Sequence, residues 1–390
     1  MFKKIRTMWG MNRRGAVVVL VAVSGTLIAG FAALTIDLGN MYIWRCELQR
    51  TADSAALGAA SALFTNDGLK QAATALSSSA LQRGNAVATQ NPVNGSTLSL
   101  RSEDVVLGHH DFTSTVPTLS AASPWNAVQV TACRTNNNNN GAMPLIFACI
   151  WGKTAADMTA SACAAVDDRV SGYTLQGNTG SGARFMPFTI PVAGYYGLLK
   201  HGPDVYSFNG TVVTGADEVR EVLMYPWKWD NTGYSGGAGN FGTLDMNRPN
   251  NGALDLSDQI RSGGALPSDV QAELNTPTLT FYDAAHPTTP ITYPCSGRPG
   301  MTTTIQTELA GQIGKVFGFF LNNNCVINGT NATYSICGVF FARIMAVDLN
   351  GGPHSLGLIL QPVGYTDSWV ITSPTAPSTS LTLGRIRLVK

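Results

Sequence analysis

The sequence predicts an α+β protein: an N-terminal transmembrane helix continues into a helix that backs an antiparallel sheet, and a second β-rich domain follows. Residues 16–36 contain no charged side chain, and beyond them apolar residues recur at helical spacings of three and four as far as Leu63. Strand-like alternation dominates after residue 92. The 390-residue chain has 41 glycines, 19 prolines and only 13% charged residues, which is typical of turn-rich β structure.

The uncharged run is long enough to cross a membrane. Its 21 residues would measure about 31 Å as an α-helix, close to the thickness of a bilayer's hydrocarbon core. A secretory signal peptide is the alternative, but its apolar region is shorter, roughly 7 to 15 residues. The helical pattern also continues past Asp37 without a break. We therefore expect residues 15–37 to form a permanent transmembrane helix.

The charges that flank this run predict its orientation. Five basic residues and no acidic one precede it: Lys3, Lys4, Arg6, Arg13 and Arg14. The positive-inside rule keeps such a segment in the cytoplasm, so residues 1–14 should be a cytoplasmic tail and the rest should lie outside the membrane. The exported part then has 20 basic and 24 acidic residues, a net charge of about −4. Such a surface is a poor nucleic-acid binder.

The exported part should comprise two units. In residues 38–170, the first helix continues to Leu63, a second is predicted over residues 69–88, and segments such as "NAVQVTACR" should form a small sheet. The glycine-rich segment "GYTLQGNTGSG" is the expected join. Residues 183–390 should form the β-rich second domain, with candidate strands that include "ARFMPFTIP" and "ICGVFFARIMAVDL".

Small residues line one side of the first helix between residues 40 and 64. The stripe consists of Ala52, Ala56 and Ala60, and Ala55 and Ala59 lie beside it. Small side chains let another backbone approach closely. We expect this stripe to be a packing surface, and self-association of the protein through this helix is one arrangement that it would allow.

The cysteines indicate an oxidising compartment. Six lie beyond the membrane-proximal Cys46: Cys133, Cys149, Cys163, Cys295, Cys325 and Cys337. An even number in an exported β-rich region predicts disulfides, although the sequence leaves their connectivity open. Zinc is the alternative, but no Cys-x-x-Cys or His-x-x-x-His spacing occurs. A hairpin that brings Cys325 and Cys337 together is the expected bridge.

No set of residues predicts catalysis or a cofactor. His109 and His110 precede Asp111 in a strand-like run, where one ring should face outward and the other inward as a structural pair. The other titratable candidates, Asp217, Glu218 and Glu221, lie in a separate run, and no Gly-x-Ser-x-Gly turn is present. We therefore expect a protein that is not an enzyme.

A metal site is not predicted either. The segment "DMNRPNNGALDLSD" is rich in oxygen donors. It departs from the EF-hand template because Gly252 stands at the eighth position and Leu256 replaces the bidentate glutamate. We interpret it as a polar loop.

Aromatic residues gather in "YPWKWDNTGYSGGAGNFG", which contains Tyr225, Trp227, Trp229, Tyr234 and Phe241. Exposed rings there could stack on sugars or on a partner subunit, whereas alternating rings could equally cover the core of the second domain. We favour the core interpretation.

Several N-terminal motifs resemble a known family. The segments "RGA" (14–16), "FAAL" (31–34), "DLG" (37–39) and "TADSAAL" (51–57), with Tyr42 and "LQ" (48–49), look like the N-terminus of the TadE/TadG-like proteins of the tight adherence (Flp, type IVc-like) pilus assembly system. "DVVLGHHDF", "NAVQVTACR" and "MTASACAAV" resemble the extracytoplasmic segment that follows, and "GNFGTLDM" (239–246) resembles a motif of its longer members. The resemblance covers the first 170 residues well.

This resemblance implies a pilin-like helix and sheet in the first exported unit and a structural role in pilus assembly or adhesion. It implies the bacterial inner membrane as the location, and the lipid bilayer and other pilus-assembly proteins or pilin subunits as partners. Two features depart from the family. No Asp-x-Ser-x-Ser occurs, so a von Willebrand-type domain is not indicated, and Leu20 stands where a processed prepilin has glutamate after a cut behind Gly15.

A second class of function remains open at this point. The chain could be an anchored envelope enzyme or carbohydrate-binding protein whose activity lies in residues 183–390, with the N-terminal region as a delivery device. Only the aromatic segment favours this alternative.

Overall fold

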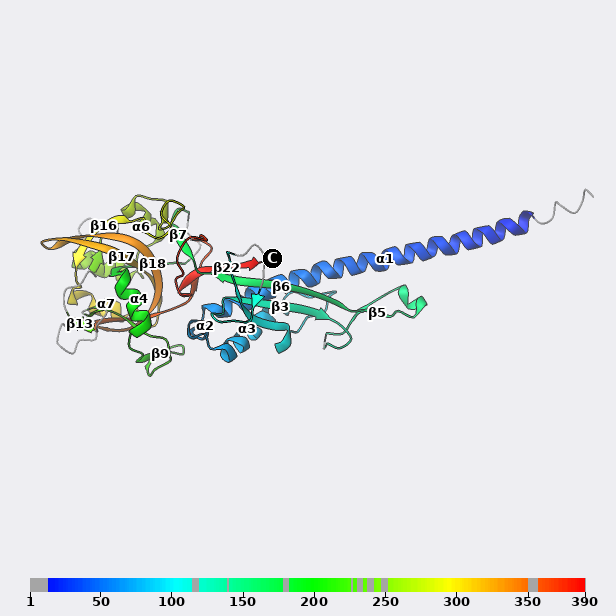
Figure 1. Ribbon diagram of the computed structural model, residues 1–390, viewed down its shortest axis with the longest axis horizontal. Helices are drawn as coiled ribbons and strands as arrows, with labels where there is room; N and C mark the ends of the chain where they lie inside the picture. Colours follow the sequence, from blue (N-terminus) through cyan, green and yellow to red (C-terminus); the bar gives the residue numbers. More distant parts are fainter. Residues whose placement is uncertain are drawn as a thin grey trace, which may run out of the picture.

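The protein consists of a long N-terminal helix that carries two lobes near its far end (Figure 1). The computed structural model describes residues 13–113, 119–138, 140–177, 182–225, 227–229, 234–236, 242–246, 252–349 and 357–389. Almost all of the expected cytoplasmic tail, residues 1–12, therefore lies outside the described residues. The mixture of helix and sheet agrees with the predicted α+β class, with a long apolar N-terminal helix and a β-rich C-terminal region.

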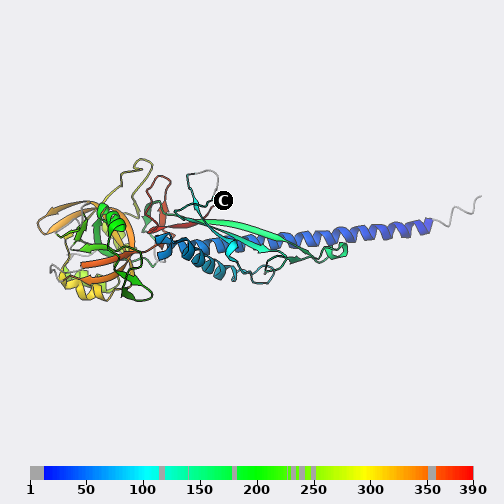
Figure 2. The ribbon, with the colours of Figure 1, turned by 60° about the horizontal axis from the view of Figure 1, so that its bottom comes forward.

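Helix α1 (Arg13–Ala60) has 48 residues, so it is about 72 Å long. It contains no proline, and its first half stands clear of both lobes in two views (Figures 1 and 2). By length and composition this helix could cross a membrane. The hydroxyls of Thr26 and Thr35 donate to the carbonyl oxygens of Ala22 and Phe31, each at 2.8 Å, so the helix satisfies these polar groups internally.

The first lobe packs three short helices and one sheet around the second half of α1. The helices are η1 (Ser61–Phe64), α2 (Asn66–Lys70) and α3 (Ala73–Ala88), with η2 (Ser102–Asp104) before the first strand. The sheet has the order β2-β1-β3-β6-β22-β20: Leu119–Ser120, Val105–His110, Ala127–Arg134, Met158–Asp167, Leu383–Val389 and Tyr365–Thr366. The expected helix over residues 69–88 is two helices, because Gln71 adopts a left-handed conformation (φ 56°) that ends α2.

A long hairpin extends from this sheet along α1. It carries the short strands β4 (Met143–Pro144) and β5 (Ala155–Ala156) and, between them, the 3-10 helix η3 (Ala148–Trp151). Both ribbon views show the end of the hairpin beside α1 (Figures 1 and 2).

The second lobe is built on a seven-stranded sheet. Its strands, in the order β11-β19-β18-β16-β14-β8-β17, are Val222–Tyr225, Gly357–Pro362, Asn331–Asp348, Tyr293–Pro299, Gly242–Leu244, Phe185–Pro191 and Val316–Asn328. Because β17 also pairs with β18, five of these strands form a closed ring. One aromatic core cluster includes Phe185 and Phe320, and another, which includes Phe319 and Phe340, is covered by helices.

Shorter elements surround this ring. The helices are α4 (Val192–His201), α5 (Ala253–Arg261), α6 (Pro267–Leu274), η4 (Thr303–Ile305) and α7 (Gln306–Ala310). The remaining strands are β7 (Val170–Thr174), β15 (Thr278–Thr280), β21 (Val370–Thr372), β9 (Tyr206–Phe208), β10 (Val212–Thr214), β12 (Trp227–Trp229) and β13 (Tyr234–Gly236).

The sequence places the join between the two lobes just before residue 183, with all later residues in the second lobe. The chain instead crosses to the second lobe earlier and comes back to the first lobe near its end. Strand β7 already belongs to a three-stranded sheet with β15 and β21, and β22 returns to the first lobe and pairs with β6. The C-terminus consequently lies beside the first lobe (Figure 1). The physical reason is that β6 would otherwise have unpaired backbone groups along this edge, which β22 satisfies.

Candidate functional site

The first half of α1 exposes large apolar side chains on all its sides. The relative exposure is 57% for Val17, 67% for Leu20, 70% for Ile28 and 68% for Phe31. A helix that is apolar all round is stable only where its surroundings are apolar, in a protein core or in a bilayer. No part of the chain that the structure describes forms such a core around these residues.

Asp37, at the end of the uncharged run, binds the tip of the long hairpin. Its carboxylate accepts hydrogen bonds from the backbone N–H groups of Ile146 (3.0 Å), Phe147 (3.0 Å to Oδ2) and Ala148 (2.7 Å). These N–H groups stand at the start of η3, where a short helix has no internal partners for them. Asp37 is only 5% exposed. No sequence pattern predicts this contact; its one signal in the sequence is a lone acidic residue directly after an apolar run.

The alanine stripe of α1 is buried inside the first lobe. All five alanines, Ala52, Ala55, Ala56, Ala59 and Ala60, have no exposed surface. The approach of α3 is close: a Cβ atom added to Gly84 would lie 3.2 Å from the Cβ of Ala59 and 3.3 Å from the carbonyl oxygen of Ala55. The other side of the stripe faces β3 and β6. The chain's own helix and sheet thus occupy the surface through which two copies could have associated.

His109 and His110 lie at the end of β1 with different surroundings. His109 is partly exposed and its Nδ1 is 2.8 Å from the carbonyl oxygen of Pro124. His110 is 7% exposed, packs edge-on against Phe112 at 4.7 Å between ring centroids, and its backbone N–H donates to Asn126 Oδ1 at 2.7 Å. Both line a cavity of about 480 Å³ that reaches the loop around Ser378.

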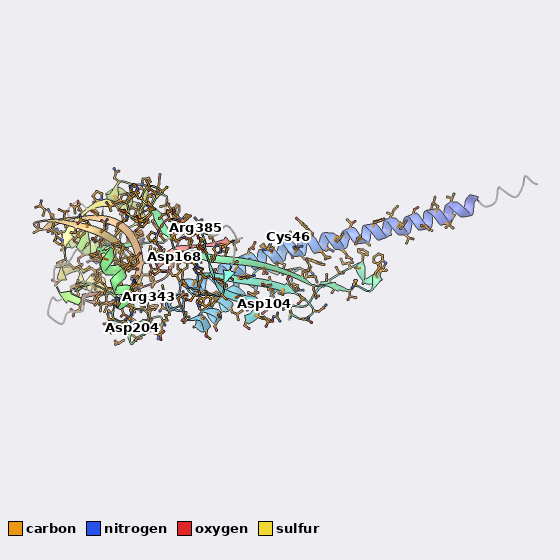
Figure 3. All side chains as sticks on the ribbon, viewed as in Figure 1. Cys46, Asp104, Asp168, Asp204, Arg343 and Arg385 are labelled. Atoms are coloured by element: carbon orange, nitrogen blue, oxygen red, sulfur yellow. The ribbon has the colours of Figure 1, made fainter. Side chains whose placement is uncertain are left out.

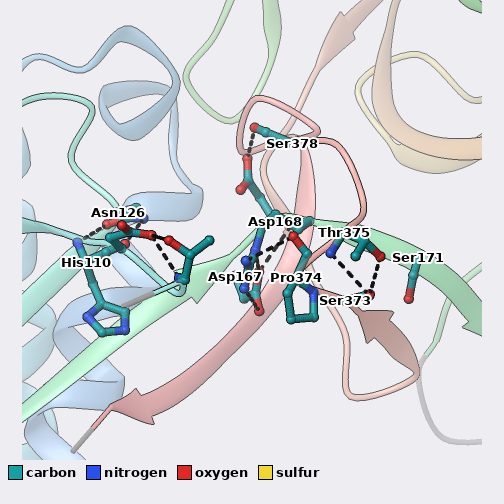
Figure 4. Close-up of polar contacts among 12 residues, drawn as sticks. His110, Asn126, Asp167, Asp168, Ser171, Ser373, Pro374, Thr375 and Ser378 are labelled. Carbon is teal, nitrogen blue, oxygen red and sulfur yellow. Dashed lines mark hydrogen bonds and ion pairs between the residues drawn. The ribbon is translucent and has the colours of Figure 1, made fainter. Parts of the chain in front are cut away.

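A network of charges lies at the junction of the two lobes. The carboxylate of Asp167, 1% exposed, forms ion pairs at 2.9 Å with both Arg169 and Arg387, and these two guanidinium groups flank the Phe112 ring at 4.8 and 4.5 Å. Asp168 accepts a 2.5 Å hydrogen bond from Ser378 Oγ (Figure 4). The Asp167–Arg387 and Asp168–Ser378 contacts join residues more than 200 positions apart, which no local sequence pattern could indicate.

The titratable groups at this junction are spread out rather than gathered at one point. In Figure 4 the His110 ring lies well away from the Asp168–Ser378 pair, so the three side chains do not form a Ser-His-Asp arrangement. Among the described residues, no group of three or more His, Cys, Asp or Glu side chains converges on a possible metal position.

The second acidic run lies in the other lobe and makes structural contacts. Asp217 accepts a hydrogen bond from Asn66 Nδ2 at 3.0 Å, which links the second lobe to α2 of the first. Glu221 is fully buried and accepts from the N–H groups of Val205 (2.9 Å) and Tyr206 (3.0 Å). Burial nevertheless raises the pKa of Glu221 from 4.5 to about 7.

The expected disulfide between Cys325 and Cys337 is not formed, and all seven cysteines are free thiols. The register explains why. Cys325 lies opposite Tyr334 in the β17–β18 hairpin, and Cys337 lies beyond the irregular pairing at Asn322. Cys325 packs against one core cluster and Cys337 belongs to the other. The labelled view places Cys46 on α1 near the first sheet (Figure 3).

Most of the aromatic segment and five residues of the oxygen-rich segment, 247–251, lie outside the residues that the structure describes. Strands β12 and β13 pair as a hairpin, but the side chains of Tyr225, Trp227, Trp229, Tyr234 and Phe241 lie outside the described residues. In the oxygen-rich segment, Asp258 forms an exposed ion pair with Arg261 at 2.9 Å.

Comparisons with known proteins assign the N-terminal part of the chain. Residues 15–62 match the model of the TadE/G-like Flp pilus-assembly family, and residues 47–164 match that of a Tad-like Flp pilus-assembly family. No curated protein and no solved structure matches the chain. The matched residues include the apolar half of α1, the alanine stripe and the strands β1, β3 and β6 up to Ala164. These matches support the resemblance of the chain to the TadE/G-like Flp pilus-assembly family over residues 15–62 and to a Tad-like Flp pilus-assembly family over residues 47–164.

Proposed function

We propose that this protein is a membrane-anchored structural component of a Flp (tight adherence) pilus assembly or adhesion machinery. In this proposal α1 crosses the bacterial inner membrane once, with the N-terminus in the cytoplasm and both lobes outside. The family match supports the pilus-assembly role. The exposed apolar half of α1 and the basic residues before it support the anchor and its orientation.

The continuity of α1 is the observation that carries this proposal. The same 48-residue helix presents apolar side chains outward over its first half and buries alanines against α3 and the sheet over its second half. A secretion signal would be released from the folded part by cleavage, whereas here the apolar half is an extension of the first lobe's central helix. The lobes are therefore held at a fixed distance from the bilayer, where pilin subunits or other assembly proteins would meet them.

The test of the anchor is fractionation of cells that express the full chain. The proposal expects full-length protein in the membrane fraction after washing with high salt and carbonate, and protection of the lobes from cytoplasmic protease. Leu20→Lys combined with Ile28→Lys should release the chain from the membrane, because placing two charges in the span raises the free energy of membrane insertion by several kcal/mol. A soluble product that begins after Ala33 would overturn it.

The test of the role is complementation. A strain that lacks the gene should lose pili or adhesion, and the full chain should restore them. Pili that assemble normally without the protein would contradict the structural role while leaving the membrane anchor intact.

A further inference from the structure

The end of the long hairpin carries large apolar side chains that no other part of the described chain covers. We call residues 145–152 the tip. Within the tip, Ile146 is 55% exposed, Ile150 is 73% exposed and Trp151 is 66% exposed. Three such side chains grouped at one end of a small lobe are unusual on a surface that faces water.

The tip lies against α1 at the level of the uncharged run. Asp37 binds the tip through three backbone N–H groups, and Ala33, one turn earlier on the same side of α1, is only 8% exposed. Ala33 belongs to the run expected to lie in the bilayer. On the open sides of α1, Leu34 and Leu38 are 51% and 56% exposed. The exposed apolar side chains of the tip therefore lie beside the end of the uncharged run, which is itself apolar and exposed.

The backbone of the tip is suited to an environment without water. Asp37 satisfies the N–H groups of residues 146–148, which would otherwise lack a partner at the start of η3. Four further N–H groups, those of Leu145, Ile150, Gly152 and Lys153, donate to carbonyl oxygens within residues 147–154 at 2.9–3.1 Å. Internal hydrogen bonding of this kind is what a lipid environment demands of a chain segment, since lipid tails offer no partners.

From these observations we propose that the tip inserts into the outer leaflet of the membrane beside α1 and gives the first lobe a second attachment to lipid. This inference rests on the proposed anchoring role of α1. Trp151 suits the boundary between headgroups and hydrocarbon, and the exposed Lys153 follows it at a position where its ammonium group can reach the headgroups. Two attachments fix the direction of the lobe relative to the membrane, whereas one helix would leave it free to rotate.

The experiment uses a fluorescent probe attached to a single exposed thiol. Cys149 lies exposed in the tip, and Cys46 lies exposed on α1, about 13 Å beyond Asp37 along the helix. The full chain is labelled with an environment-sensitive dye at Cys149 in a Cys46→Ser variant, and at Cys46 in a Cys149→Ser variant. A third sample carries Val19→Cys, within the span, in the double serine variant. The double serine variant without Val19→Cys shows how much dye the other cysteines take up.

Each sample is reconstituted into vesicles of phosphatidylethanolamine and phosphatidylglycerol and is exposed to a nitroxide lipid or to aqueous iodide. We expect lipid quenching and a blue-shifted emission at positions 19 and 149, and iodide quenching at position 46. Lipid quenching at 19 with iodide quenching at 149 would overturn the inference and leave the anchor intact. Protection of 149 from both quenchers would mean that a second copy covers the tip, which also overturns it. No lipid quenching at any position would overturn both proposals.

A pair of variants tests the apolar side chains themselves. Ile150→Asp combined with Trp151→Asp should abolish lipid quenching at Cys149 and leave the protein in the membrane through α1. The matched control is Val106→Asp, at a 48% exposed position on β1, which should leave the quenching unchanged. Unchanged quenching in the tip variant, with a retained circular dichroism spectrum, would contradict the inference.

Discussion

The two lobes of this protein fill their cores with side chains of opposite size. The first core is rich in alanine, from Ala52 on α1 to Ala164 on β6, so that helices and strands approach one another closely. The second lobe is filled by rings: Phe185 lies 5.5 Å from Phe320, and Phe319 lies 5.5 Å from Phe340. The lobe that holds α1 is therefore sensitive to added atoms, and the ring-filled lobe is sensitive to removed ones.

The largest effect should come from removing a ring in the second lobe. Phe320→Ala leaves a cavity beside Phe185 and Phe341, and we expect a loss of about 3–5 kcal/mol in the free energy of unfolding. Denaturant unfolding of the detergent-solubilised chain measures it. Val326→Ala, at a 61% exposed position on the same strand, should change this free energy by less than about 0.5 kcal/mol. Similar losses of unfolding free energy in both variants would contradict the prediction that the buried ring matters more than the exposed side chain.

The next largest effect concerns pH and is confined to the second lobe. Glu221 has a folded-state pKa of about 7 against an ordinary 4.5, so the folded state retains a proton that the unfolded chain releases. The free energy of unfolding should therefore fall by about 3 kcal/mol as pH rises from 4.5 to 7, and this contribution should be constant above that range.

Glu221→Gln should remove this dependence, and Glu218→Gln, at an exposed neighbouring position, should retain it. Unfolding at pH 4.5, 6 and 8 makes the comparison. A wild-type slope that persists in Glu221→Gln would assign the titration to another group.

A smaller effect should follow from adding atoms to the first lobe. Ala56→Leu places three more carbon atoms between α1 and its neighbours, and we expect a loss of about 1–3 kcal/mol in unfolding free energy together with impaired assembly. Gln49→Leu is the control, since Gln49 is exposed and hydrogen-bonds to Asp53 at 2.8 Å. Equal effects of the two changes would show that the alanine stripe does not require small residues.

The smallest effects are expected where no bridge or catalytic contact exists. Cys325→Ser and His109→Gln should each change stability by less than about 1 kcal/mol, because Cys325 is a free thiol and the His109 ring is partly exposed. Unfolding with and without a reducing agent checks the cysteine, and the adhesion phenotype checks the histidine. A large drop in stability on reduction would show a disulfide that this structure does not contain.

Local patterns in the sequence predicted what depends on neighbouring residues. The apolar run and the 3.6-residue periodicity predicted α1, and alternation predicted β3 and β6, because helix and strand contacts recur at fixed spacings. The same reasoning predicted a bridge between Cys325 and Cys337, which are free thiols in the structure. Spacing alone could not show that Cys325 faces Tyr334 across the hairpin, since the register is set by the place where the chain turns, between Asn328 and Asn331.

What the sequence could not predict are contacts between distant segments. Asp37 meets the tip 109 positions later, and Asp167 meets Arg387 across the first sheet. The return of β22 to β6 likewise depends on the edge that β6 leaves open, which exists only once the sheet has formed.

The return of β22 has a mechanical consequence. Asp167, the last residue of β6, is paired with Arg385 near the start of β22, so both connections to the second lobe leave the first sheet at the same end. A pull on the second lobe is then directed along both strands at once. It is resisted by the β3–β6 ladder, from Ala127–Ala165 to Arg134–Met158, whose hydrogen bonds lie across the pull and share the load. Such a joint yields only when the whole ladder slides, which suits the proposed role of an anchored component.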